Sequence, residues 1–244
     1  MKANVRPAGM IRARLRGPDA RSGAIKFGRT LVLAAILFVG ALADGEVHAR
    51  SLKLVALGDS LTAGYGLRRS KSFPVQLGRA LEDRGLKVEV INAGVSGDTA
   101  SAGLARLDWA VPKGTDAVIL ELGANDALRG IDPEVTHRAL DRIVTRLAKR
   151  GIAILLAGFE APRGLGDAYT RRFARIYTDI AKAHDVLFYP FFLKGIALRP
   201  KLNQRDGMHP NPAGVRVIVR NILPMVEKLL ERSKLARSAR NKGG

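Results

Sequence analysis

The chain has 244 residues, 47% of them hydrophobic, which is enough for one well-packed domain of ordinary size or for a small domain with a tail. It contains no cysteine, and this excludes disulfides, thiolate catalysis and cysteine-ligated zinc. The formal net charge of +19 indicates a solvated basic surface or an attraction to anionic partners, but no basic and aromatic pattern accompanies it, so we expect no nucleic-acid binding.

The beginning of the chain has the features of a targeting segment. Basic residues precede an apolar run at 31–43, which is too short to span a bilayer, since that takes about 20 residues. A basic flank, a short apolar core and small residues after it are typical of a secretory signal peptide. We expect cleavage after Ala43 or Ala49 and a start at Met1 or Met10, with retention as a membrane anchor as the alternative. The segment predicts a periplasmic or secreted protein.

Beyond this segment, short apolar runs alternate with stretches of helical periodicity. The expected strands are residues 52–57, 88–91, 117–122, 152–157 and 186–189. The expected helices are residues 74–84, 99–111, 133–150, 168–184 and 211–232. This alternation predicts a parallel five-stranded sheet with helices on both faces, a three-layer α/β/α sandwich of the α/β class.

The predicted elements divide the chain into three parts. We expect a signal peptide over residues 1–49, one α/β domain over residues 50–232, and a basic, disordered tail over residues 233–244. The sequence shows no internal repeat, no low-complexity segment and no linker between domains. We expect the protein to be a monomer.

Four short islands of polar residues follow the predicted strands. Gly-Asp-Ser-Leu at 58–61 follows the first strand, residues 94–98 follow the second, and Gly-Ala-Asn-Asp at 123–126 follows the third. Asp-Gly-Met-His at 206–209 comes after the fifth. In parallel sheets, ligands bind beyond the carboxyl ends of the strands. We therefore expect the four islands to meet at one edge of the sheet.

The residue types in these islands suit the transfer of an acyl group to water. Ser60 offers a hydroxyl nucleophile, and His209 can take its proton. Asp206, three residues earlier, can accept the Nδ1–H of the imidazole and leave Nε2 for the serine. The backbone N–H groups of Ser60 and Gly97 and the side-chain amide of Asn125 are the expected oxyanion donors.

Each of these residues also has an ordinary structural interpretation. Ser60 can be a turn serine or a helix cap, Asn125 can close an Asx turn, and Gly97 can be a turn glycine with positive φ. Negative charge beside an oxyanion would oppose its formation. The acidic neighbours are therefore expected to hold loops and not to react: Asp59, Asp98 and Asp126.

The islands and their flanks resemble the SGNH (GDSL) hydrolase superfamily. The strings GDSLTAGYGL, NAGVSGDT, ELGANDALRG and DGMHPN are similar to its bacterial periplasmic branch of arylesterase, acyl-CoA thioesterase I and lysophospholipase L1. The resemblance covers about residues 52–230 and implies a flavodoxin-like SGNH hydrolase fold. It implies a triad of Ser60, Asp206 and His209, an oxyanion hole of Ser60, Gly97 and Asn125, and neither cofactor nor metal.

The same resemblance implies the class of substrate. It points to small aryl and short-to-medium acyl esters, and further to acyl thioesters and lysophospholipids, with the preference among them left open. One alternative is a carbohydrate O-deacetylase of the same fold, which ranks lower because aromatic residues for stacking on sugars make up only 5% of the chain. Another is a non-catalytic basic module that binds lipid. The positive charge also suggests transient contact with an anionic membrane surface.

Overall fold

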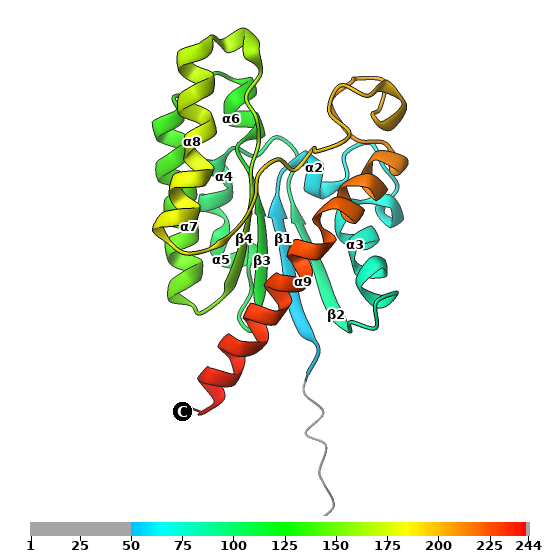
Figure 1. Cartoon of the computed structure of the whole chain (residues 1–244), viewed down its shortest axis with the longest axis vertical. Coiled ribbons are helices and arrows are strands. Elements are labelled where there is room, and N and C mark those ends of the chain that lie inside the picture. The colour runs from blue at the N-terminus through cyan, green and yellow to red at the C-terminus, as the bar shows by residue number, and fades with distance from the viewer. Residues whose placement is uncertain (1–49, 243–244) are drawn as a thin grey trace, which may run out of the picture. The chain divides into compact units, whose positions relative to one another are not determined.

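A computed structural model describes residues 50–242, and the signal peptide expected over residues 1–49 lies outside these described residues. One parallel sheet has the strand order β2-β1-β3-β4-β5 (Figure 1). The strands are β1 (Leu52–Gly58), β2 (Val88–Gly94), β3 (Ala117–Glu121), β4 (Ala153–Ala157) and β5 (Leu187–Tyr189). This is the strand order of flavodoxin-like sheets, in which the winding reverses between β1 and β3.

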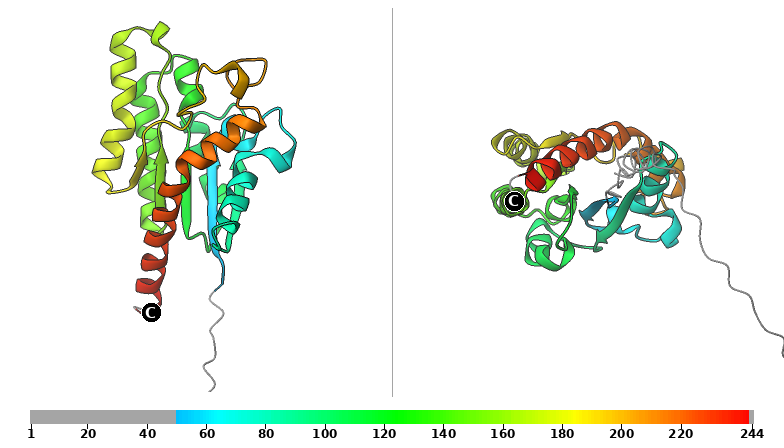
Figure 2. Two further views of the ribbon diagram at one scale, coloured as in Figure 1. Left: turned by 45° about the vertical axis from the view of Figure 1, so that its right-hand side comes forward. Right: turned by 90° about the horizontal axis from the view of Figure 1, so that it is seen from below.

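Helices cover both faces of this sheet. The chain forms α2 (Ser60–Ala63), α3 (Phe73–Glu82), α4 (Ala100–Ala105), α5 (Leu107–Ala110), α6 (Ala124–Leu128), α7 (Pro133–Lys149), α8 (Asp167–Ala183) and α9 (Pro212–Lys242). The helices α4, α5, α7 and α8 lie on one side of the sheet, and α3 and α9 on the other (Figures 1 and 2). The predicted three-layer α/β/α sandwich is confirmed. None of the helices described is long and apolar enough to cross a membrane.

The central strands are apolar along their length because both of their faces are buried. In β1, Val55 and Leu57 enter the core beneath α7 and α8. Their neighbours Leu54 and Ala56 enter the core beneath α3 and α9. This explains why the strand predicted from a continuous apolar run does not alternate with polar residues. Because both faces of the central strands are buried, polar side chains that could act on a substrate must lie in the loops at the strand ends.

The helix expected over residues 99–111 is interrupted in the structure. It is divided at Arg106, which separates α4 from α5. The Arg106 side chain is buried, its Nη2 donates to the Gly58 carbonyl at 2.9 Å, and its Nε pairs with Asp98. The break brings a guanidinium to the end of β1, which helical periodicity alone does not predict.

The end of the chain differs from the expected disordered tail over residues 233–244. Helix α9 does not end at Arg232 but continues to Lys242. Neither glycine nor proline occurs between residues 225 and 242, and the buried Ser233 donates from Oγ to the Leu230 carbonyl at 2.7 Å. Arg237 also donates to the carbonyl of Arg50 at 3.0 Å, which joins the extended helix to the start of the sheet.

Tyr177 connects α8 to the end of β3. It is fully buried, and its hydroxyl donates to the Leu122 carbonyl at 3.0 Å. Burial raises the pKa of Tyr177 well above its ordinary value, so the hydroxyl keeps its proton. The next residue, Gly123, has a φ of +114°, and a Cβ there would lie 2.2 Å from the Tyr177 hydroxyl. The turn that leads from β3 into α6 therefore requires glycine.

Replacing Tyr177 with Phe is expected to lower the free energy of unfolding by about 1–3 kcal/mol, because the Leu122 carbonyl is left buried without a donor. Thermal denaturation followed by circular dichroism measures this as a lower Tm, by about 2–4 °C per kcal/mol. Tyr169→Phe is the matched control, since the Tyr169 hydroxyl donates to the partly buried Ile131 carbonyl, where water can replace it. Equal Tm values for the two variants would contradict the assignment.

Candidate active site

Ser60, His209 and Asp206 form a continuous chain of hydrogen bonds. Ser60 begins α2 directly after β1, while Asp206 and His209 lie in the loop that leads into α9. The Nε2 of His209 is 3.0 Å from the Ser60 Oγ, and its Nδ1 is 2.7 Å from the Asp206 Oδ2. The structure thus brings together the three residues that were predicted from the sequence, in the predicted order of contact.

The local backbone holds Asp206 against the histidine. The second carboxylate oxygen, Oδ1, accepts from the backbone N–H groups of Met208 at 2.9 Å and His209 at 3.0 Å. The bond from the His209 N–H is the main cause that lowers the pKa of Asp206 to about 2. Asp206 is therefore ionised at neutral pH and favours the tautomer that carries its proton on Nδ1, with Nε2 facing Ser60.

Tyr65 and Gln204 support the other side of the histidine. The ring of Tyr65 lies 4.7 Å from the His209 ring, centroid to centroid, at a tilt of 41°. Gln204 donates from Nε2 to the carbonyls of Tyr65 at 2.7 Å and Pro210 at 3.1 Å. Sequence reasoning gave neither residue a role. Tyr65 lies within the string GDSLTAGYGL, but nothing in that string indicates a contact with His209, and Gln204 stands in no motif.

The expected oxyanion donors lie at the same edge. The backbone N–H groups of Ser60 and Gly97 make no hydrogen bond within residues 50–242, and Gly97 has a φ of +88°, which favours glycine. Asn125 stands in the first turn of α6, and its Nδ2 donates to the Asp59 Oδ2 at 3.1 Å and to the Asp98 carbonyl at 3.0 Å. Both Asn125 donors are thus already engaged in the resting protein, which the sequence did not indicate.

One buried carboxylate joins the nucleophile to this asparagine. Asp59 accepts from the Leu61 N–H at 3.0 Å through Oδ1 and from Asn125 through Oδ2, so it caps α2 and positions the amide. Burial raises the pKa of Asp59 to about 6. Beneath it, Glu121 accepts from the Thr62 hydroxyl at 2.7 Å and from the Asp59 N–H at 3.4 Å. Burial, followed by the charge of Asp59, raises the pKa of Glu121 well above its ordinary value.

The expectation that the acidic neighbours hold loops is confirmed. Asp98 pairs with Arg106, as described above. Asp126 accepts from the Ala100 N–H at 2.9 Å and from the Thr136 hydroxyl at 3.0 Å, so it fixes the start of α4 against α7. Sequence reasoning missed Glu121 and its partner Thr62. The signal for them was a lone charge at the end of an otherwise apolar strand, which in a buried strand requires a hydrogen-bond donor nearby.

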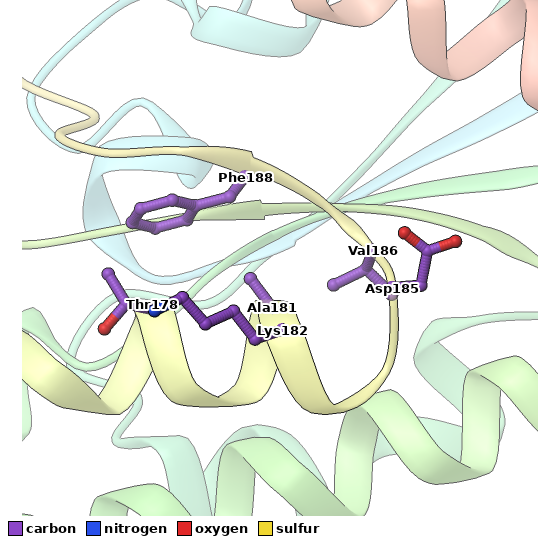
Figure 3. Close-up of a pocket in the computed structure, with 6 residues that line it drawn as sticks. All are labelled: Thr178, Ala181, Lys182, Asp185, Val186 and Phe188. Atoms are coloured by element: carbon purple, nitrogen blue, oxygen red, sulfur yellow. The ribbon is translucent and has the colours of Figure 1, made fainter.

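A separate surface pocket of about 320 Å³ lies between the end of α8 and the start of β5 (Figure 3). It is lined by Thr178, Ala181, Lys182, Asp185, Val186 and Phe188. This is the amino end of β5, at the opposite end of the sheet from Ser60, and the Thr178 hydroxyl there donates to the Arg175 carbonyl at 2.9 Å. In the described part of the chain, no three His, Asp or Glu side chains gather as a metal site requires.

The raised pKa of Asp59 predicts a pH-dependent difference in stability. Its folded pKa of about 6 exceeds the ordinary value of 3.8, so the folded state binds a proton more tightly, and stability falls as pH rises between these two values. Asn at this position cannot ionise. We therefore expect the free energy of unfolding of Asp59→Asn, relative to the unchanged protein, to rise between about pH 4 and about pH 7 in urea denaturation. A pH-independent difference would contradict the assignment.

Known proteins are similar to most of this chain. The model of the GDSL-like Lipase/Acylhydrolase family matches residues 56–217. An arylesterase from Vibrio mimicus is 38% identical over 182 residues, which cover 74% of this chain and 90% of that protein. The thioesterase 1/protease 1/lysophospholipase L1 of Escherichia coli K12 is 37% identical over 182 residues, which cover 74% of this chain and 82% of that protein. The crystal structure of TesA matches with a TM-score of 0.69 and 34% identity, over 72% of this chain and 99% of that one. The resemblance seen in the sequence is confirmed, and the chain belongs to the GDSL-like lipase/acylhydrolase family.

Proposed function

We propose that this protein is a secreted serine esterase that hydrolyses aryl and short-to-medium acyl esters through an acyl-enzyme intermediate. The observation that carries the proposal is the Ser60–His209–Asp206 chain, with 3.0 Å between Oγ and Nε2 and 2.7 Å between Nδ1 and the carboxylate. The relatives named arylesterase and thioesterase/lysophospholipase support esters as substrates, and extend them to acyl thioesters and lysophospholipids.

In the first half of the reaction, the serine is acylated. The Nε2 of His209 takes the proton of Ser60 as Oγ attacks the acyl carbon, and the carbonyl electrons move onto oxygen. Asp206 stabilises the imidazolium that forms, because it is ionised and bonded to Nδ1. The tetrahedral intermediate then expels the alcohol or thiol, which receives the proton from Nε2.

The negative oxygen of the intermediate is held by groups on three loops. The backbone N–H groups of Ser60 and Gly97 are unengaged, and both can donate without breaking a bond. Asn125 must turn one N–H from the Asp98 carbonyl toward the oxyanion, while Asp59 keeps hold of the other. In the second half, water loses a proton to His209 and attacks the acyl carbon. The bond from this carbon to the Ser60 Oγ then breaks, Oγ takes the proton back from Nε2, and the carboxylic acid leaves.

The proposed location follows from the leader. The basic flank and apolar run before residue 50 support export through a signal peptide, cleaved after Ala43 or Ala49, to the periplasm or the outside of the cell. We further propose that the mature protein acts as a monomer.

Replacing Ser60 with Ala is expected to lower the turnover of p-nitrophenyl acetate by about 10⁴-fold or more, because the acyl group has no nucleophile to join. The Tm should change little, since Ser60 contributes no buried packing. Ser101→Ala, an exposed serine of α4, is the matched control and should keep full activity. Turnover that survives in Ser60→Ala would contradict the mechanism. Palmitoyl-CoA and a lysophospholipid in the same assay distinguish thioesterase and lysophospholipase activity from arylesterase activity.

Replacing Asn125 with Ala is expected to lower kcat by about 10²–10³-fold with little change in KM, because the amide acts on the transition state. Asp59→Asn should also lower kcat, because the one oxygen of the amide cannot accept from both the Leu61 N–H and Asn125. The double variant should then be no slower than Asn125→Ala alone. Asp126→Asn is the matched control: it alters a buried carboxylate that makes no hydrogen bond to the Asn125 side chain, so its effect on kcat should add to that of Asn125→Ala. Additive effects of the Asp59 and Asn125 changes would contradict the positioning role.

A further inference from the structure

Two loops lie side by side next to the catalytic histidine. The first, residues 64–72, follows α2, and the second, residues 197–208, leads toward α9. Gln204 joins them through its bond to the Tyr65 carbonyl at 2.7 Å. In Figure 1 they are the cyan and gold segments beyond the carboxyl ends of the strands. Together they form one surface that contacts His209 through the ring of Tyr65 and the carboxylate of Asp206.

This surface is strongly basic. We name it the basic face and define it by six exposed side chains: Arg68, Arg69, Lys71, Arg199, Lys201 and Arg205. None of the six has an ion-pair partner within residues 50–242. The single acid in the two loops, Asp206, is bonded to His209. The basic face therefore presents uncompensated positive charge to whatever approaches the active site.

Apolar side chains stand among these cations. Leu198 is 95% exposed, and its φ of +58° is a left-handed conformation that branched, bulky residues rarely adopt. Tyr65 and Met208, beside His209, are about half exposed. An apolar side chain surrounded by Arg and Lys matches the boundary of an anionic bilayer, where phosphates lie at the level of the cations and hydrocarbon lies just below.

We propose that the basic face docks on an anionic phospholipid surface, with Leu198 entering the interface and the six cations meeting lipid phosphates. Docking in this orientation brings Ser60 and His209 close to the membrane surface. Nucleic acid or another soluble polyanion would use the same cations but has no place for Leu198. The inference rests on the surface alone and does not require the proposed hydrolysis.

The test uses residues 50–244, because this part folds without the leader. The buried hydrophobic residues of the described structure all lie between Leu52 and Leu230. The solved TesA chain, which matches 72% of this chain, is covered over 99% of its own length. Omitting residues 1–49 also removes an apolar run that would bind lipid by itself.

Vesicle binding is measured by cosedimentation on the Ser60→Ala protein, so that hydrolysis cannot alter the lipid. We expect binding to equimolar phosphatidylcholine and phosphatidylglycerol, weak binding to phosphatidylcholine alone, and release by salt. Arg68→Ala, Arg69→Ala and Lys71→Ala combined should weaken binding about 100-fold, since each basic residue near an anionic leaflet contributes about fivefold. The matched control removes the same charge from exposed lysines at the opposite edge of the sheet, by replacing Lys87, Lys113 and Lys149 with Ala, and should change binding little.

Leu198→Asn tests the apolar contact separately. Asn accepts the left-handed backbone, so the variant should fold at least as stably as the parent protein and bind vesicles about tenfold more weakly. Equal binding to both vesicle types, or an equal loss in the control triple variant, would overturn the proposal. A short DNA duplex that binds as tightly as the vesicles, with Leu198→Asn unchanged toward both, would reassign the face to polyanions in general. Ester turnover, assayed on the protein that retains Ser60, tests the proposed function independently.

Discussion

The structure of the site depends on the buried carboxylate of Asp59. One oxygen caps the helix that presents Ser60, and the other accepts from the side chain of Asn125, so a single side chain fixes both groups relative to each other. These two residues come from the ends of adjacent strands, β1 and β3, at the point where the winding of the sheet reverses. Without this link, no side chain would fix the start of α2, which carries Ser60, relative to the start of α6, which carries Asn125.

Burying this carboxylate is unfavourable in itself, and the surrounding structure compensates for it only in part. Asp59 receives donors from Leu61 and Asn125, and Glu121 receives donors from Thr62 and the Asp59 backbone, but no cation contacts either carboxylate in the described part of the chain. The positive charge of Arg106 is placed one loop away, on Asp98 and the end of β1. Such a site sacrifices stability to hold polar groups in a fixed arrangement, which is typical of preorganised active sites.

The sequence predicted those features of the molecule that depend on local pattern. Apolar runs and helical periodicity were sufficient to predict the five strands and the three-layer sandwich. Because the strands are parallel, the residues that follow them directly had to meet at one edge of the sheet. Features that depend on contacts between distant segments were missed. The break at Arg106 exists because its guanidinium reaches β1, and the packing of Tyr65 on His209 exists because Gln204 joins their loops. Likewise, α9 continues past Arg232 along a sequence that contains no helix-breaking residue.

The engagement of both Asn125 donors in the resting protein affects how the site distinguishes a substrate from its transition state. The Asp98 carbonyl competes for the same N–H that an oxyanion would use. A neutral ester oxygen is no better an acceptor than a peptide carbonyl, so the bound substrate has no means of displacing this bond. A full negative charge forms a stronger, charge-assisted bond and can displace it. The internal competitor therefore withholds Asn125 from the ground state and makes its binding energy available only as charge develops, which is the condition under which binding accelerates a reaction.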